Sequence, residues 1–500
     1  EINKIEPKEV LVTEDFYGEI KEKLDDFLQK NDSVVTFVNK VRDSAKYLMD
    51  YFEIVSLESY GIKDKKAIIG AAAMALDYAV TMQVEHELTV EKIEFVNISN
   101  YAEINAITSR NLELLKNQRE KTVYGSLLWV LDECKTSMGT RLLKRFINNP
   151  LLNIEKIRKR QEDVQYFIDN ILIREDLREK LENIYDLERL LGKITFGSEN
   201  GKDLTALKKT IKSAVEIMKI LGNTDFFKDI DANILFECYK IIDDSINEDA
   251  PFSVREGGII KSGYNAELDE IRNIMNSGKD FLLDIEQRER EATGIRNMKI
   301  KFNKVFGYFI EITKANLDMV PEHYIRKQTL SNSERYITPE LKKYEDTIIN
   351  SKAKIEDLEY HLFKEISGKL KEHRKILSEL AERLAYIDVM VSFAVSAIEN
   401  DYAKPEMNEE YSFEIEGGRH PVVEKLIGRT DYVSNDTVFT EKESFVVLTG
   451  PNMSGKSTYM KQIALISIMA QIGSFVPAKK ANLSVIDKYL TRIGASDDIL

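Results

Sequence analysis

The sequence predicts a multidomain protein that is mainly α-helical, with a smaller α/β part near each end. Three observations support this fold class. Five hundred residues are too many for one hydrophobic core. Nine prolines are few for this length, which favours long helices. Short apolar runs typical of strands occur near both ends, and residues at helical spacing fill most of the chain between them.

Composition limits the class of protein further. A hydrophobic content of 43% and a charged content of 31% suit a soluble globular chain. The net charge of −14 excludes a chain that is basic all over, but it allows a local basic patch that binds nucleic acid. The two cysteines, Cys134 and Cys238, form no C-x-x-C motif, which favours a reducing cytoplasm over a disulfide framework or zinc site. No apolar run has membrane-spanning length, and no signal peptide is visible.

The first 60 residues alternate strand and helix patterns. Apolar runs at 9–12 and 34–38 read as strands, and the pattern of 17–28 reads as a helix. We interpret this segment as part of a small α/β domain. The chain begins with Glu1 instead of Met, so we expect a piece of a longer protein.

Residues 62–250 are patterned as helices. Asn149-Pro150 and the segment 197–201 mark turns within them. We interpret this region as a helical scaffold. A further helical stripe lies within residues 266–293 and comprises Leu268, Ile271, Met275, Leu282 and Ile285.

The periodicity then changes to that of a strand. Apolar residues fall on even positions at Ile300, Phe302, Phe306, Tyr308, Ile310 and Ile312, with Lys304 as the exception and a break expected at Gly307. Pro339 opens a second helical stretch whose apolar stripe continues to Val391. At 1.5 Å per residue, roughly 50 helical residues would span about 75 Å. Two long helices around a small β insert therefore predict a lever arm with a compact tip.

The predicted tip is basic. Residues 296–343 contain ten Lys or Arg and five Asp or Glu, an excess of five positive charges in an acidic chain. Such a cluster is either a solvated face or a surface for nucleic-acid phosphates, whose binding is insensitive to sequence and sensitive to salt.

The most specific motif is a glycine-rich loop between a predicted strand and a predicted helix. Residues 443–449 read as an apolar strand, and 458–472 read as a helix. The loop fits the pattern G-x-x-x-x-G-K-[ST], in which backbone N–H groups and a helix N-terminus surround phosphate oxygens. We therefore predict that it binds the phosphates of ATP through Gly450, Pro451, Asn452, Met453, Ser454, Gly455, Lys456, Ser457 and Thr458.

Two of these side chains have individual roles. Lys456 is expected to reach the β- and γ-phosphates, and the Ser457 hydroxyl is the expected Mg²⁺ ligand. Hydrolysis also needs an acid at the end of a second strand. Only Asp487, Asp497 and Asp498 follow the loop, and no apolar run ending in Asp-Glu is present. We therefore predict ATP binding and assign no catalytic residue.

Several segments resemble a known family. They are 449–466 (TGPNMSGKSTYMKQIALI), 471–478, 491–498 and Gly418 to Glu424 near the loop, and Arg110 to Leu114, Met138 to Arg145, Gly263 to Asn265, Phe306 to Tyr308 and Glu334 to Leu341 before it. In this order they resemble the bacterial MutS family of DNA mismatch-repair ATPases. The resemblance covers nearly the whole chain and is more specific than the loop alone.

The resemblance implies a domain order. It implies a partial α/β connector domain at 1–61, a core helical domain at 62–265 and a lever tip with DNA clamp at 266–343. A returning lever helix at 344–402 and a truncated P-loop ATPase domain at 403–500 follow. The family's mismatch-reading domain, with its Phe-x-Glu motif, and the later part of its ATPase domain have no counterpart here. For the parent protein the resemblance implies ATP hydrolysis coupled to mismatch repair, double-stranded DNA as ligand, a homodimer and a MutL-type partner.

The family's motifs also suggest individual residues. Tyr432, Val433 and Asn435 occupy the place where the family holds the adenine base. His420 is interpreted as a structural group in its Arg-His-Pro turn. The candidates for DNA phosphate contact in the clamp are Lys301, Asn303, Lys304, Arg326, Lys327, Asn332 and Arg335.

Two alternatives remain open. The first is the bacterial paralogue that lacks mismatch reading and ends in a nuclease-like domain, although the connector-like start and the clamp insert favour MutS itself. The second is a non-hydrolysing DNA- or partner-binding fragment that responds to nucleotide. An ATPase assay beside an ATP-binding assay would separate that fragment from an enzyme.

Overall fold

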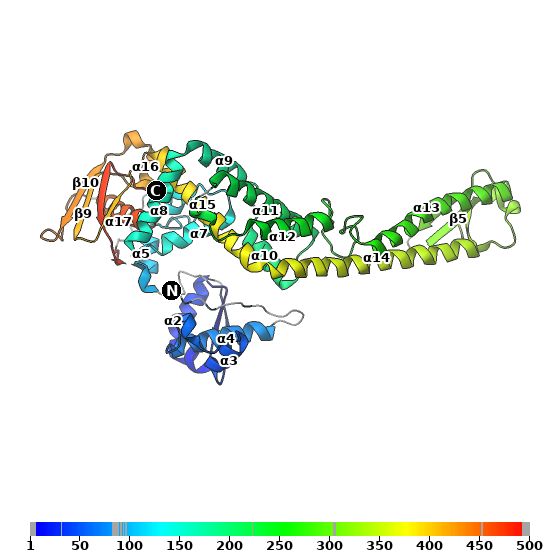
Figure 1. Cartoon of the computed structure of the whole chain (residues 1–500), viewed down its shortest axis with the longest axis horizontal. Coiled ribbons are helices and arrows are strands. Elements are labelled where there is room, and N and C mark those ends of the chain that lie inside the picture. Colours follow the sequence, from blue (N-terminus) through cyan, green and yellow to red (C-terminus); the bar gives the residue numbers. More distant parts are fainter. Residues whose placement is uncertain are drawn as a thin grey trace. The chain divides into compact units, whose positions relative to one another are not determined.

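The structure of the protein is a computed structural model, and it describes residues 7–492 except positions 32, 83–89, 91–92, 94, 96–97, 223, 304–306 and 452–453. Figure 1 shows that helices dominate and that the sheets are small. The chain forms two compact units, described separately below. One comprises Glu1–Phe196, Ser213–Ile230 and Ile376–Leu500, and the other comprises Gly197–Lys212 and Asp231–Lys375. No helix in the described part of the chain is long and apolar enough to cross a lipid bilayer.

The N-terminal segment is an α/β structure. Strands β1 (Glu9–Val12) and β2 (Val34–Phe37) pair in parallel, with helix α2 (Glu14–Asn31) as the crossover between them. Val12, Leu24 and Phe27 form the small core of this piece. Helices α3 (Ser44–Tyr51) and α4 (Lys66–Met82), with the 3-10 turn η1 (Leu57–Tyr60), form a second core beside it. The strands and helix expected in the first 60 residues are confirmed.

Helices build the region that follows, as the 62–250 pattern predicts. The expected turns are also confirmed: α7 ends just before Asn149-Pro150, and Gly197 has a φ of +68° between α10 and α11. Short elements η2 (Ile98–Asn100), β3 (Glu103–Ile104) and η3 (Asp225–Phe227) connect them. The helices are α5 (Ala106–Asn111), α6 (Leu127–Leu131), α7 (Ser137–Asn148), α8 (Ile154–Asp169), α9 (Ile171–Leu181), α10 (Leu187–Phe196), α11 (Gly201–Leu221), α12 (Ala232–Ser245) and, later in the chain, α15 (Arg374–Asn400).

A buried carboxylate joins two helices of this core. Asp388 on α15 accepts hydrogen bonds from the backbone N–H groups of Lys135 and Thr136, at 2.9 and 2.8 Å. It also accepts one from the Thr136 hydroxyl, which in turn accepts from the N–H of Gly139 and caps α7. A Cβ on Gly139 would lie 2.8 Å from Asp388 Cγ, so only glycine allows this close approach.

The second unit contains an antiparallel helix pair. Helix α13 (Ala266–Thr293) and the long α14 (Pro339–Glu372) lie side by side in Figure 1. Arg272 near the start of α13 binds Glu359 near the end of α14, at 2.7 Å. Arg288 near the end of α13 binds Glu340 near the start of α14. Ion pairs at both ends therefore hold the helices in antiparallel register, as the two-arm prediction requires.

A four-stranded antiparallel sheet lies between these helices along the chain. Its order is β4-β5-β7-β6, from β4 (Lys299–Asn303), β5 (Gly307–Thr313), β6 (Ile325–Thr329) and β7 (Ser333–Ile337), and η4 (Lys314–Met319) precedes β6. The predicted alternation is confirmed in β5, where Ile310 and Ile312 are buried in the core of this sheet. Phe302 in β4 is 57% exposed, and Phe306 lies outside the described residues. Gly307, with a φ of +73°, opens β5 at the expected break.

The C-terminal part combines one long helix with a small mixed sheet. The sheet has the order β10-β9-β11-β8, and only β11 and β8 pair in parallel. Helix α17 contributes buried apolar residues that include Leu465, Ile466 and Met469. The elements are β8 (Glu406–Asn408), β9 (Ser412–Gly418), α16 (Pro421–Ile427), η5 (Arg429–Asp431), β10 (Asn435–Thr440), α17 (Lys456–Gln471), β11 (Lys480–Ser484) and β12 (Lys488–Tyr489), and β12 pairs with β3.

Two expectations from the sequence are wrong. Residues 443–449 form no strand, and Phe445 and Val447 are 84% and 73% exposed. An apolar run becomes a strand only when neighbouring strands satisfy its backbone, and none of the described strands pairs with this run. The helix expected to continue unbroken to Val391 is interrupted at His373, between α14 and α15, although the apolar stripe stays buried on both sides, at Leu370 and Leu377. Neither proline nor glycine marks that break in the sequence.

Candidate nucleotide and nucleic-acid sites

The glycine-rich loop leads directly into α17. Gly455 has a φ of +87°, a left-handed conformation that favours glycine, and it precedes the first helical residue, Lys456. The predicted helix is therefore confirmed, and its positive dipole end faces the loop. Ser457 and Thr458 lie half-buried in the first turn, whereas Ser454 is exposed. Asn452 and Met453 lie outside the described residues.

The ammonium of Lys456 closes the loop on itself. Lys456 Nζ donates hydrogen bonds to the carbonyl oxygens of Gly450, at 2.8 Å, and of Pro451. Gly450 lies close to Ser454, whose Oγ would be 3.0 Å from a Cβ on Gly450. The loop therefore brings together an ammonium, a hydroxyl and a helix N-terminus, the groups that suit a phosphate.

The three residues expected at an adenine base lie close together in the chain: Tyr432 and Val433 follow η5, and Asn435 begins β10. Tyr432 is half-buried, and its hydroxyl donates a 2.7 Å hydrogen bond to Gln462 Oε1 on α17. Val433 is 80% exposed, and Asn435 donates to the Val433 carbonyl at 3.0 Å. Tyr432 is thus held against the helix that starts at the loop.

A second contact fixes β10 to the same helix. The hydroxyls of Thr437 and Tyr459 lie 2.9 Å apart, and the Tyr459 hydroxyl also donates to the Asp436 carbonyl at 3.2 Å. Tyr459 lies in the first turn of α17 and Gln462 in the next. The turn at Tyr432 and strand β10 are therefore both bound to the first two turns of the helix that follows the loop.

His420 is a structural residue, as expected. Its Nδ1 accepts the N–H of Val423 and caps α16. Burial, with a smaller effect from the charge of Lys461, lowers the pKa of His420 to about 3. The imidazole is therefore neutral at physiological pH.

A buried ion pair ties α17 to the start of the core. Lys461 Nζ lies 3.2 Å from Glu113 Oε2, and the two side chains are only 2% and 9% exposed. Glu113 has a φ of +52°, and its other carboxylate oxygen accepts the N–H of Gln118 at 2.9 Å. Sequence reasoning missed this pair. The position of Lys461, four residues before the buried Leu465, was the available signal that it faces the core.

Five of the predicted DNA-contacting residues lie on the small antiparallel sheet, but not on one face: Lys301, Asn303, Arg326, Lys327 and Arg335. Cross-strand register places Lys301 opposite Phe309, and Glu311 opposite Arg335, on the face away from the sheet's core. Glu311 binds Lys301 at 3.0 Å and approaches Arg335 at 3.9 Å. The Arg335 guanidinium lies 4.4 Å from the centre of the Phe309 ring. Two predicted phosphate ligands are therefore partly neutralised by one carboxylate.

Arg326 and Lys327 lie on the edge strand β6. Arg326 is opposite Tyr336, whose ring is in the sheet's core, and it lies 3.5 Å from Glu334. The register shifts between Arg326 and Gln328, which makes Lys327 the extra, exposed residue of a bulge. Glu311 and Glu334 are among the five acids already counted in this segment, but which cations they pair with could be found only from strand register.

The remaining clamp candidates are separated from these. Asn303 ends β4 and is half-buried, whereas Asn332 is exposed between β6 and β7. The Asn332 carbonyl accepts the N–H of Lys314 at 3.1 Å. Lys304 lies outside the described residues.

The fold and these sites define the class to which the chain belongs. It is a multidomain, mainly helical protein. In one unit a glycine-rich loop leads into a helix, and in the other an antiparallel sheet lies along the chain between the two paired helices α13 and α14. The family model described as MutS domain III matches residues 107–394, and the model described as MutS domain V matches residues 446–500. The chain therefore belongs to the MutS family.

Individual relatives agree with this assignment. The chain is 51% identical to the DNA mismatch repair protein MutS of Fusobacterium nucleatum subsp. nucleatum, over 100% of this chain and 56% of that protein. It is 44% identical to the protein of that name from Halothermothrix orenii and 43% identical to that from Clostridium botulinum (strain Okra), covering 56% and 54% of them. The chain thus spans little more than half the length of these relatives. Nothing in these matches supports the paralogue with a nuclease-like tail.

Proposed function

We propose that the chain binds ATP through the loop at 450–458, with Mg²⁺ at the Ser457 hydroxyl. The observation that carries this proposal is the closed loop around Lys456. Its ammonium is held by two backbone carbonyls and can transfer to the oxygens of a bound polyphosphate. The N–H groups at the start of α17 supply further donors to the same anion.

The base would lie against the turn at Tyr432. The hydrogen bond from Tyr432 to Gln462 supports this placement, because it holds the phenol beside the helix that carries the phosphate site. The ring can stack on adenine, Val433 can pack on it, and Asn435 can bond its edge. Bound ATP would supply the phosphate charge and further oxygen ligands for Mg²⁺. The residues of the chain would bind and orient the ATP.

We propose that the sheet β4–β7 binds the backbone of double-stranded DNA. Its local charge and the exposure of Lys301, Arg326 and Lys327 support this role. Glu311 and Glu334 moderate the positive field, so we expect contact that is weak at physiological salt and independent of base sequence. The candidate contacts Asn303, Asn332 and Arg335 lie on this sheet or in its loops, and Lys304 is proposed from the sequence alone.

For the whole protein we propose ATP-dependent DNA mismatch recognition and repair. Relatives that match this chain over its whole length carry the name DNA mismatch repair protein MutS, which supports the proposal. ATP hydrolysis, a homodimer, a MutL-type partner and a cytoplasmic location belong to the same proposal. For these 500 residues the competing function is a nucleotide-responsive DNA clamp that does not hydrolyse ATP.

ATP binding is tested by calorimetric titration with Mg²⁺ present. We expect Lys456→Ala to weaken binding by about tenfold or more, since a charge-assisted hydrogen bond contributes about 1.5–3 kcal/mol. Lys442→Ala, an exposed lysine before the loop, is the matched control and should have no effect. Equal affinity in the Lys456→Ala variant would refute the phosphate site. A parallel ATPase assay decides between the enzyme and the non-hydrolysing clamp, because robust turnover that Lys456→Ala abolishes would exclude the latter.

DNA binding is tested by fluorescence anisotropy of a labelled duplex across a salt series. Arg326→Glu with Lys327→Glu should weaken binding and flatten its dependence on salt. The slope of the logarithm of the binding constant against the logarithm of the salt concentration should become less steep by about 0.9 for each phosphate that the protein no longer neutralises. Lys219→Glu with Lys240→Glu changes the net charge equally at exposed helix positions. If both double variants lower affinity to the same extent, net charge explains the loss and the sheet is not the contact site.

A further inference from the structure

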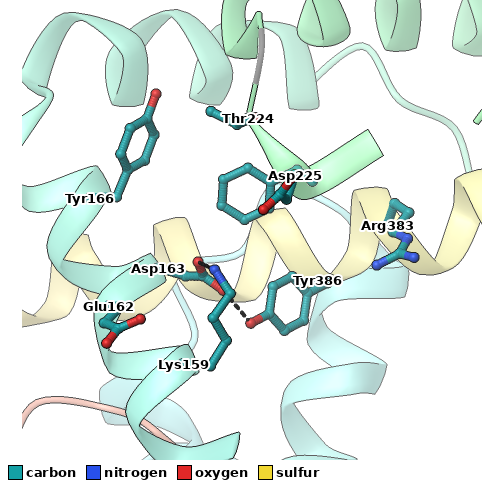
Figure 2. A pocket seen from close by; sticks show the side chains of 9 residues that line it. Lys159, Glu162, Asp163, Tyr166, Thr224, Asp225, Arg383 and Tyr386 are labelled. Carbon is teal, nitrogen blue, oxygen red and sulfur yellow. Dashed lines mark hydrogen bonds and ion pairs between the residues drawn. The ribbon is translucent and has the colours of Figure 1, made fainter. Parts of the chain in front are cut away.

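A cavity of about 430 Å³ lies in the helical core, away from the loop residues discussed above. Figure 2 shows its walls, which come from helix α8, the turn at η3 and helix α15. This volume falls within the roughly 300–1,000 Å³ of pockets that hold small ligands. The lining residues are Lys159, Glu162, Asp163, Tyr166, Thr224, Asp225, Phe226, Arg383 and Tyr386.

The charged groups around the cavity do not balance. Lys159 Nζ donates to Asp163 Oδ1 at 2.7 Å, and the Tyr386 hydroxyl donates to Asp163 Oδ2 at 2.7 Å, as Figure 2 shows. The hydrogen bond to Asp163 raises the pKa of the Lys159 ammonium, and the nearby charges of Glu162 and Asp225 add to the effect. One ammonium therefore faces three carboxylates. Among the described residues, neither Glu162 nor Asp225 has a cation within ion-pair distance.

The other cation of the cavity does not correct this imbalance. Arg383 Nη2 lies 3.3 Å from Asp229 Oδ2, a carboxylate outside the cavity lining. Arg383 is thus already paired. The lining has three carboxylates against Lys159 and Arg383, an excess of one negative charge, and Arg383 is shared with Asp229, so the cavity favours a cationic ligand.

Aromatic rings form the apolar part of the wall. The Phe226 ring is 6.2 Å from the ring of Tyr166 and 6.5 Å from that of Tyr386, and both pairs are tilted. Phe226 also stacks on Phe167 at 5.4 Å, which fixes its orientation. Tilted rings around a space with a negative rim are the arrangement that attracts an organic cation through the ring faces.

One buried polar atom also lacks a partner. The hydroxyl oxygen of Thr224 is inaccessible to solvent and makes no hydrogen bond to any residue that the structure describes. Such an atom leaves part of its hydrogen-bonding capacity unused. Because water does not reach this oxygen, a ligand in the cavity would contact it only after the wall at Thr224 moved.

We propose that this cavity binds an organic cation, namely the guanidinium group of an arginine side chain. A guanidinium is planar and weakly hydrated, so it stacks on aromatic rings better than an ammonium does. Its five N–H donors can pair with the carboxylates of the rim, at Glu162 or at Asp225. The site is separate from the nucleotide and DNA sites and does not depend on their proposed function.

The test uses Nα-acetyl-arginine amide as the probe and ligand-observed NMR titration of the whole chain. We expect saturable binding, and no binding of Nα-acetyl-citrulline amide, which has nearly the same shape without the charge. Free arginine is titrated in the same way as a second probe. Equal binding of free arginine identifies the side chain as sufficient, and tighter binding of the blocked probe points to arginine within a polypeptide; either result supports the site.

Variants then locate the site. Glu162→Gln with Asp225→Asn should weaken binding of the arginine probe by about fivefold or more, because two charge interactions are lost at a partly exposed site. Asp176→Asn on α9, an exposed acid outside the cavity, should leave affinity unchanged. The proposal is overturned if the probe does not bind, if citrulline binds equally well, or if the double variant binds as the wild type does while its circular dichroism spectrum is unaltered.

Discussion

The ion pair between Lys461 and Glu113 allows a stability prediction of known size. Lys461→Met keeps most of the aliphatic side chain but leaves the Glu113 carboxylate without its cation, in a place where that side chain is only 9% exposed. The remaining hydrogen bond, from the N–H of Gln118, does not neutralise the charge. Removing one partner of a buried pair costs about 3–5 kcal/mol, so we expect the free energy of unfolding to fall by about 3 kcal/mol.

The assay is urea unfolding followed by fluorescence. Trp129 is the single tryptophan of the chain, and it lies two residues after Leu127, whose N–H donates to the Glu113 carbonyl at 3.0 Å. Its emission therefore reports on the structure around the pair. Lys63→Met is the control, because the Lys63–Glu58 pair is 58% and 71% exposed and should contribute less than about 1 kcal/mol.

A second substitution makes the test sharper. Adding Glu113→Gln to Lys461→Met removes the unpaired charge, so the double variant should recover much of the lost stability. A loss below about 1 kcal/mol in the single variant would refute the reasoning, since it would place the pair in the class of exposed ion pairs. A double variant less stable than the single one would show that packing, and not charge, dominates.

Three other predictions follow from the same structure. Because the pKa of His420 is lowered to about 3, the unfolded chain binds a proton that the folded chain does not, so stability should fall as pH decreases from about 6.5 towards 3, by up to about 1.4 kcal/mol per pH unit. His420→Asn should remove that part of the pH dependence in urea titrations, and an unchanged profile would contradict the assignment. Glu311→Gln should tighten duplex DNA binding and steepen its salt dependence, because it releases the two cations beside it; weaker binding would count against the sheet as the contact surface. Gly139→Ala should lower the melting temperature strongly, since its Cβ would meet Asp388, and a shift of less than about 2 °C would show that this contact relaxes freely.

Local signals explain which elements could be predicted. The bounds of α13 match the expected 266–293 because Asn265 caps its first turn and Gly294, at a φ of +74°, ends it. The start of α14 is marked in the same way by Thr338 and Pro339. Where caps and periodicity agree, the sequence alone determines the element.

Features that depend on distant residues were not predictable. The run 443–449 has strand composition, but its structure depends on neighbouring strands and not on its own residues. The neutralisation of Lys301 by Glu311 depends on strand register. The contact of Gln462 with Tyr432 joins positions 30 residues apart. The loop motif identified a candidate site, but only the fold identified the residues that surround and restrain it.

The hold of Lys456 on its own loop has a consequence for affinity. An incoming anion must displace the carbonyls of Gly450 and Pro451 from the ammonium, so binding is an exchange and not a simple addition. The measured affinity is then the difference between two sets of contacts. Small anions such as sulfate, which engage few of the loop's donors, should compete poorly, whereas a polyphosphate gains enough contacts to open the loop. In the proposed nucleotide site, the hydrogen bonds of Lys456 to these two carbonyls would therefore favour a polyphosphate over weak anions.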